Sequence, residues 1–228
     1  MEAHRIAVMS DTHGLLRPEC ISILKTCEMI LHAGDVGKPE VLYKLREIAE
    51  THVVRGNVDK EWAADLPEEL DTELYGFHFY MVHNKKQIRA DLSDVDIVIY
   101  GHSHKYEEKT EGNIIYLNPG SCGVRRFRLP VTMMVLTLFP EERRIEIEKI
   151  DCLSESEEKE QLSVFPQKEM DRLIRKILKE MNAGKGVAEI AGKVRADREL
   201  VEQICRIYTT HPGVDVDGIL NRMELKDL

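Results

Sequence analysis

Acidic residues, histidines and one asparagine occur directly after several apolar stretches of this chain. Seven of them stand out: Asp11, His13, Asp35, Asn57, His83, His102 and His104. Carboxylate and imidazole groups suit Mn²⁺, Fe, Zn²⁺ or Ni²⁺, and no cysteine among them favours a softer metal. Seven ligands are too many for one tetrahedral ion with an open position. They suit two ions that share a carboxylate, which serve phosphoryl and hydrolytic chemistry when held about 3.5–4 Å apart.

The preceding stretches are typical of buried β-strands, because they are rich in Ile, Val and Met with little alternation. We expect strands at 5–10, 28–33, 51–55, 73–82, 96–100, 114–117 and 131–139. Apolar spacing predicts helices at 18–26 and 38–50. Hairpins at 74–78 and between 131–139 and 144–150 favour two packed sheets with flanking helices. The carboxyl ends of the strands in an open α/β sheet converge on one crevice, so the seven residues are expected to form one cluster.

Each of these residues also has an ordinary structural explanation when it is considered alone. Asp11 could cap a helix, and Asp35 and Asn57 could belong to turns. His102 and His104 are the hardest to explain in this way, because GHSH directly follows an apolar stretch. The placement of all seven residues directly after strands, in this order, favours a common functional site.

The order D-x-H, GD, GN, H and GHxH resembles that of the calcineurin-like metallophosphoesterases. The forms SDTHG, LHAGD, RGNVD, GHSH and NPGS are similar to the small bacterial and archaeal phosphodiesterase branch typified by YfcE. The resemblance covers about residues 4–150. It implies a four-layer α/β/β/α sandwich with a dinuclear metal site, for which we expect two divalent ions, Mn²⁺ first and Ni²⁺, Fe or Zn²⁺ as alternatives.

The family pattern implies a role for each of the seven residues. The first ion would be bound by Asp11, His13 and His104, and the second by Asn57, His83 and His102. Asp35 would bridge the two ions. A hydroxide between them would attack phosphorus. The expected catalytic residues are Asp35, Asn57 and His83. The expected reaction is phosphodiester hydrolysis. A phosphomonoesterase or nuclease with the same site, and a DNA-associated regulator, are the alternatives.

The chain departs from the family pattern at two motifs. Many members have a histidine that helps to protonate the leaving group where this chain has Val58, which predicts a preference for leaving groups that need little protonation. The fourth motif reads VHNKK, so His83 is the expected ligand and His78 is its alternative. Lys85 or Lys86 could contact a phosphate, although the start of a solvated helix explains them better.

Four further residues near the motifs have open roles. His32 could support the site or be a buried structural histidine, and Ser121 in NPGS could orient a ligand. Arg125 and Arg126 could reach an anionic substrate or face solvent.

Composition changes after residue 150, which predicts a phosphoesterase domain at 1–150, a linker at 151–166 and a helical domain at 167–228. The helices expected there include 187–194 and 199–208, which resemble a helix-turn-helix. The 12 Lys and Arg against 11 Asp and Glu of 165–228 give no strong basic footprint. Helical packing, with dimerisation as one use of it, is therefore the preferred explanation of this domain.

The overall composition bounds the partners of the chain. A net charge of −9 disfavours non-specific binding to nucleic acid and to membrane surfaces. No membrane partner is expected, whereas nucleic acid remains an open partner because of the helical domain. No apolar run is long enough to span a bilayer, and the N-terminus predicts no signal peptide. Five irregularly spaced cysteines indicate reduced thiols and a cytoplasmic location. The expected partner is a small phosphorylated or phosphodiester substrate, and a homo-oligomer is an alternative state.

Overall fold

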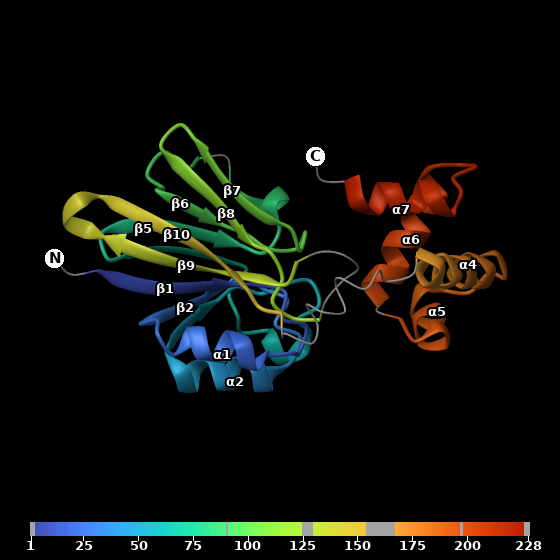
Figure 1. Ribbon diagram of the computed structural model, residues 1–228, viewed down its shortest axis with the longest axis horizontal. Helices are drawn as coiled ribbons and strands as arrows, with labels where there is room; N and C mark the ends of the chain where they lie inside the picture. The colour runs from blue at the N-terminus through green and yellow to red at the C-terminus, as the bar shows by residue number, and fades with distance from the viewer. Residues whose placement is uncertain (1–2, 90, 125–129, 154–166, 197, 226–228) are drawn as a thin grey trace. The chain divides into compact units, whose positions relative to one another are not determined.

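The computed structural model describes residues 3–89, 91–124, 130–153, 167–196 and 198–225. The chain divides into two compact units, Met1–Glu158 and Lys159–Leu228. The first unit contains two five-stranded sheets, and the described part of the second unit is helical (Figure 1). Most of the predicted linker, residues 154–166, lies outside the described residues.

The first sheet has the strand order β10-β9-β1-β2-β3. Its members are β1 (His4–Met9), β2 (Met29–His32), β3 (Glu50–Val53), β9 (Thr132–Phe139) and β10 (Arg144–Asp151). Strands β1, β2 and β3 are parallel, whereas β9 runs antiparallel to β1 and to β10. Helices α1 (Pro18–Leu24) and α2 (Pro39–Ile48) lie together on one side of this sheet (Figure 1). A short 3₁₀ helix, η3 (Pro140–Glu142), connects β9 to β10.

The second sheet has the strand order β4-β5-β6-β8-β7. Its members are β4 (Glu69–Leu74), β5 (Phe77–Val82), β6 (Ile97–Ile99), β7 (Tyr106–Glu111) and β8 (Ile114–Pro119). The central strands β5, β6 and β8 are parallel, and the two edge strands are antiparallel to their neighbours. The 3₁₀ helix η1 (Glu61–Ala63) precedes this sheet. The 3₁₀ helix η2 (Lys85–Gln87) follows β5, and Ile88 and Leu92 pack against the buried Tyr80 and Tyr100 of this sheet.

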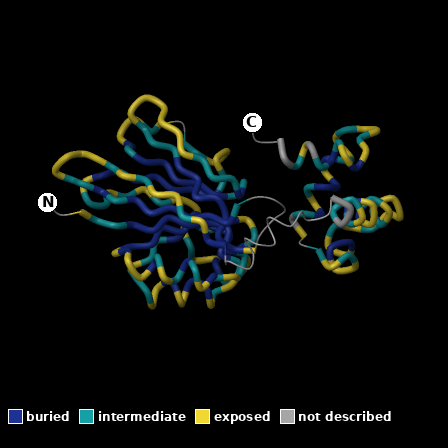
Figure 2. The backbone as a smooth tube through the Cα atoms, in the orientation of Figure 1, coloured by how far each residue is buried: buried dark blue, intermediate teal, exposed yellow. Residues whose placement is uncertain are grey.

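Strand β1 shows why the strands read as continuous apolar runs. Its side chains alternate between two cores: Ile6 and Val8 belong to the cluster that joins the sheets, while Ala7 and Met9 belong to the cluster under the helices. All four are fully buried, and Figure 2 shows the same burial along the neighbouring strands. Strands buried on both faces hold the loops at their carboxyl ends in fixed positions.

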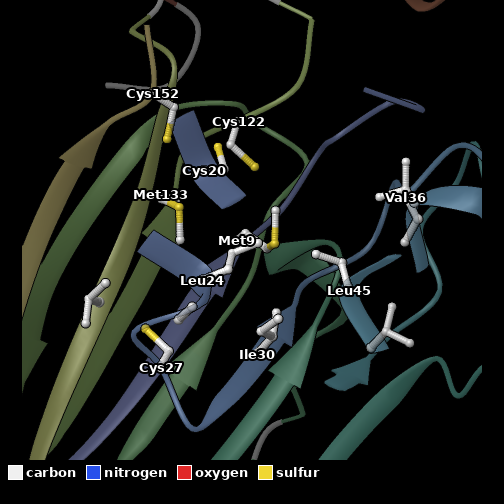
Figure 3. Close-up of a cluster of buried hydrophobic side chains, with 14 of the residues drawn as sticks. Met9, Cys20, Leu24, Cys27, Ile30, Val36, Leu45, Cys122, Met133 and Cys152 are labelled. Carbon is white, nitrogen blue, oxygen red and sulfur yellow. The ribbon is translucent and has the colours of Figure 1, made fainter. Parts of the chain in front are cut away.

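The cluster under the helices contains four of the five cysteines. Figure 3 shows Cys20, Cys122 and Cys152 close together at one end of it, and Cys27 farther along. All five cysteines are buried and free. Burial raises the pKa of Cys27, so its thiol is disfavoured as a thiolate and serves as a packing group.

The expected α/β class with two packed sheets flanked by helices is confirmed, and three details differ. Helix α2 ends at Ile48, because Glu50 already begins β3. The hairpin expected at 74–78 is confirmed, with Tyr75 and Gly76, both with positive φ, in its turn, but its first strand begins at Glu69 rather than at residue 73. Strand β7 was not expected, because its sequence YEEKTE is mostly charged, as befits an exposed edge strand.

The second unit contains α4 (Gln167–Asn182), α5 (Val187–Val194), α6 (Arg198–Thr210) and α7 (Val216–Leu225). Its core includes Ile174, Ile190 and Ile204, each fully buried. Arg195 has a left-handed backbone with φ 54° and ends α5 shortly before α6 begins. The expected small all-α domain is therefore confirmed. Within the described residues, no helix combines the length and the apolar character needed to cross a membrane.

Candidate metal centre

All seven predicted site residues lie in loops that follow parallel strands. Asp11 and His13 follow β1, Asp35 follows β2 and Asn57 follows β3 in the first sheet; His83 follows β5, and His102 and His104 follow β6 in the second. Backbone hydrogen bonds join the first two loops, since Asp11 N–H donates to Gly34 and His13 N–H donates to Asp35. The carboxyl ends of both sheets thus supply one set of polar groups.

The first group of polar side chains consists of Asp11, His13 and His104. The Nε2 atoms of His13 and His104 are 3.1 Å apart. Asp11 Oδ1 lies 3.2 Å from His104 Nε2 and 3.8 Å from His13 Nε2. Two imidazole nitrogens and one carboxylate oxygen therefore converge on one point.

The second group consists of Asp35, His83 and His102, with Asn57 between the histidines. Asn57 Oδ1 is 3.0 Å from His83 Nε2 and 3.0 Å from His102 Nδ1. Asp35 Oδ2 lies 3.3 Å from His83 Nε2. The structure thus places His83 beside Asp35. The alternative, His78, instead contacts Asp71 at 2.5 Å on the β4–β5 hairpin and belongs to neither group.

Each carboxylate accepts hydrogen bonds through one oxygen, while its other oxygen accepts none and faces histidine nitrogens. Asp11 Oδ2 accepts hydrogen bonds from Ser10 Oγ at 2.6 Å and from His102 N–H at 3.1 Å. Asp35 Oδ1 accepts one from Val58 N–H at 2.9 Å. The other oxygens, Asp11 Oδ1 and Asp35 Oδ2, are buried and accept no hydrogen bond.

This donor set fits metal ions. A buried carboxylate oxygen without a partner is costly, and a cation bound to it removes that cost. Both such oxygens face imidazole nitrogens, which are common ligands of divalent transition metals. His83 has the expected orienting contact, because its Nδ1 lies 2.8 Å from the carbonyl oxygen of Ala33. That contact fixes Nε2 as the nitrogen that faces Asp35.

The charges of the two carboxylates favour proton binding by the neighbouring histidine. Burial by itself would lower the pKa of His83, but the nearby Asp35 and Asp11 raise it to about 9. Burial would likewise raise the pKa of Asp11, and His104 and His83 outweigh that effect and hold it well below its usual range. A metal ion must therefore displace a proton from this network, which makes metal binding weaker at lower pH.

The backbone around the site is unusual. Asp11, His13, Asp35, His102 and His104 all have φ between 47° and 70°. Asp and His tolerate this left-handed region better than most residues do, but it remains uncommon for any side chain. Such conformations concentrate at functional sites.

Glycine is required at Gly56 because of close packing. A Cβ atom there would lie 2.1 Å from both the backbone nitrogen and Oδ1 of Asp35. At Gly101 it would lie 2.8 Å from Asp11 Oδ2. These glycines allow neighbouring loops to approach the carboxylates.

Asp59 supports the site and was not predicted from the sequence. Its buried carboxylate accepts hydrogen bonds from three backbone N–H groups: Oδ1 from Gly37 at 2.7 Å, and Oδ2 from Gly56 at 2.9 Å and Val36 at 3.2 Å. It therefore ties the loop of Asp35 to the loop of Asn57. The signal was present as the acid two residues after Asn57, but in sequence it reads as an ordinary turn residue.

His32 is a buried structural residue that holds two loops. Its Nε2 lies 3.0 Å from Thr12 Oγ1, and its Nδ1 accepts a hydrogen bond from Gly34 N–H. Because Thr12 Oγ1 donates to Val36, Nε2 is the donating nitrogen and the ring is neutral. Burial lowers the pKa of His32 to about 4, in agreement with a neutral ring.

Other residues singled out in the sequence lie around the site. Ser121 Oγ donates to the carbonyl of Asp11, so it supports that loop. Lys85 binds Glu107 at 2.9 Å and begins η2 together with Lys86, as a helix start was expected to do. Arg125 and Arg126 lie outside the described residues.

Comparison with known proteins identifies the family. The calcineurin-like phosphoesterase superfamily domain matches residues 5–139. The chain belongs to this superfamily. A probable metallophosphoesterase of Methanothermobacter thermautotrophicus is 31% identical over 161 residues, which are 64% of this chain and 89% of the relative. A phosphodiesterase of Methanocaldococcus jannaschii is 28% identical over 139 residues, 52% of this chain and 84% of that protein.

A solved structure supports the same conclusion for the fold. A predicted phosphoesterase from Streptococcus pneumoniae has a TM-score of 0.52 and 25% identity, covering 67% of this chain and 91% of that one. The chain is thus an enzyme of the metallophosphoesterase class. In this enzyme Val58 directly follows Asn57, and the backbone N–H of Val58 donates a hydrogen bond to Asp35.

Proposed function

We propose that this phosphoesterase uses two divalent metal ions to hydrolyse phosphodiesters. The observation that carries the proposal is the pair of side-chain groups that each combine imidazole nitrogens with a buried carboxylate oxygen that accepts no hydrogen bond. Asp11, His13 and His104 would hold one ion, and Asn57, His83 and His102 the other. Asp35 would serve both ions.

The ions would supply an acidified water as nucleophile and would neutralise charge on the phosphate oxygens. The chain itself supplies orientation. Ser10 and the His102 backbone fix Asp11, and the Val58 backbone fixes Asp35. Asn57 is exposed and His13 and His102 are only partly buried, so a phosphate would approach from their side. The carboxylates of Asp11 and Asp35 are fully buried, away from that side.

A phosphodiester substrate is supported by the relative that is named a phosphodiesterase. Val58 supports a substrate whose leaving group needs little protonation, since its side chain offers no proton. We further propose Mn²⁺ as the metal, and a cytoplasmic location in which the five free thiols stay reduced.

The test begins with protein stripped of metal by a chelator and dialysed. Titration with Mn²⁺, followed by metal analysis, should give two ions per chain and restore hydrolysis of bis-p-nitrophenyl phosphate. Asp35→Asn should bind fewer ions and lose activity, while Asp65→Asn, the same change at an exposed acid, should retain both.

Three results would contradict parts of the proposal. One ion per chain in the active protein would reject the two-metal site. Faster turnover of p-nitrophenyl phosphate than of the diester would favour a phosphomonoesterase. No activity with any divalent metal, in protein that still binds two ions, would favour the alternative of a regulator that keeps the fold as a scaffold.

A further inference from the structure

Helix α4 carries a row of exposed cations that the phosphoesterase chemistry does not use. The row, here called the basic stripe, consists of Arg172, Arg175, Lys176 and Lys179, all exposed. Their spacing of three, four and seven residues places them on one face of the helix. At 1.5 Å per residue, the stripe extends about 10 Å along the helix axis.

The charges of the basic stripe are not neutralised within the described part of this unit. Among the residues of α4 whose side chains the structure describes, the acids are Asp171 and Glu180. Asp171 forms no ion pair, and its buried Oδ1 has no partner. Glu180 is bound by Lys185 at 2.8 Å and Lys193 at 2.7 Å, and these two lysines lower its pKa to about 2. Glu180 is thus paired with lysines outside the stripe.

The opposite face of α4 is committed to the core of the unit. Ile174 and Ile177 are fully buried, in one cluster with Ile190 and Val201. A helix that inserts into a membrane surface needs a free apolar face, and α4 has none to offer. The stripe therefore fits a partner that is recognised by charge and lies against a rigid helix.

We propose that the basic stripe binds the phosphate backbone of a nucleic acid. One strand of B-form DNA presents a phosphate about every 3.4 Å along the axis, so about 10 Å of helix faces about three phosphates. The whole chain has a net charge of −9, which gives no general attraction to a polyanion, so binding must rest on this local surface. The contact involves phosphates alone and predicts no base specificity. It does not depend on the proposed diesterase activity.

The test measures binding of the full-length protein to a fluorescein-labelled duplex of about 20 base pairs, by anisotropy between about 50 and 200 mM salt. About three phosphate contacts predict a slope of about −3 for log affinity against log salt. The double variant Arg175→Glu/Lys176→Glu should bind at least tenfold more weakly, with a slope smaller by about 2. A matched RNA duplex should behave alike, because the contacts are to phosphates.

The matched control is Lys44→Glu/Arg46→Glu, which makes the same charge change at exposed positions of α2. It should bind as the unmodified protein does. The duplex affinity of a neutral variant, Arg175→Gln/Lys176→Gln, should lie between that of the Arg175→Glu/Lys176→Glu variant and that of the control. Circular dichroism should show that all variants keep their helices.

The proposal fails if the stripe variants and the control bind equally, or if the duplex does not bind at low salt. It also fails if the stripe variants lose only binding to anionic phosphatidylserine vesicles, which would assign the surface to lipid. A change of oligomeric state in sedimentation without a change in duplex affinity would assign it instead to a second copy of the acidic chain.

Discussion

Asp59 offers a sharp test of how the loops around the metal centre are held. The change Asp59→Asn keeps the size of the side chain but replaces one acceptor oxygen with an NH₂ group. Rotating the amide so that its oxygen occupies the Oδ2 position preserves the bonds from Gly56 and Val36. The N–H of Gly37, now at 2.7 Å from Oδ1, then loses its acceptor.

One hydrogen bond to a charged group contributes about 1.5–3 kcal/mol. For a unit of this size, about 1 kcal/mol shifts the melting temperature by about 2–4 °C, so Asp59→Asn should lower it by about 3–12 °C. Asp59→Ala loses all three bonds and should be two to three times worse. Melting is followed by circular dichroism with chelator present, so that metal binding does not contribute.

The same variants should bind metal more weakly. Asp59 fixes the loops of Asp35 and Asn57 relative to each other. Its loss should therefore lower Mn²⁺ affinity about 10–100-fold in calorimetric titration, as the loss of residues that orient metal ligands typically does. Asp65→Asn is the control and should change neither quantity. If Asp59→Asn melts within about 1 °C of that control, the three bonds do not hold the loops, and the reasoning is refuted.

Four further predictions follow from the site. Gly56→Ala should sharply reduce Mn²⁺ binding, because its Cβ would overlap Asp35, whereas Gly192→Ala, with nothing within 4 Å, should be harmless or stabilising; equal effects would contradict the packing argument. Asn57→Ala should weaken the second ion more than the first, and equal loss of both in a titration would reject the division of ligands. A general acid contributes about 10²–10⁴-fold, so Val58→His should flatten the dependence of rate on leaving-group pKa across substituted phenyl diesters. A shallow slope in the unmodified enzyme would show that another acid already protonates the leaving group. The pKa of His32 is lowered to about 4 in the folded protein, so between about pH 6.5 and 4 the unfolded chain binds a proton that the folded chain does not, and stability is lost as the pH falls. The lost free energy of unfolding could reach about 2 kcal/mol at about pH 5. His32→Gln should therefore reduce the loss of melting temperature between about pH 7 and 5.

Part of the site was open to prediction because strand ends in α/β folds are places where side chains converge. The position of Asp35 after β2 and of His83 after β5 follows from the apolar runs that precede them. The choice of His83 over His78 could not be made from spacing alone. It depends on the hairpin, which turns His78 toward Asp71.

The supporting residues were harder to find. Asp59 and Ser10 act through backbone and side-chain hydrogen bonds that form only when separate loops meet, and neither residue type is unusual in a turn. Strand β7 is mostly charged because it lies at an edge, so its pattern lacks the apolar signal of a buried strand. The basic stripe was hidden by the near-neutral total of its unit, since a sum of charges does not record which face carries them.

The left-handed backbone at five of the proposed ligands has a consequence for how this sequence can change over time. A side chain in that region costs about 1–2 kcal/mol relative to an ordinary conformation, and glycine avoids the cost. Replacing His13 or His102 with glycine would thus relieve strain in the fold while removing a proposed metal ligand. Stability alone would push these positions toward glycine or asparagine. Aspartate and histidine at these positions are a constraint that the fold does not need, so a lineage released from hydrolysis could lose the proposed ligands and keep the scaffold.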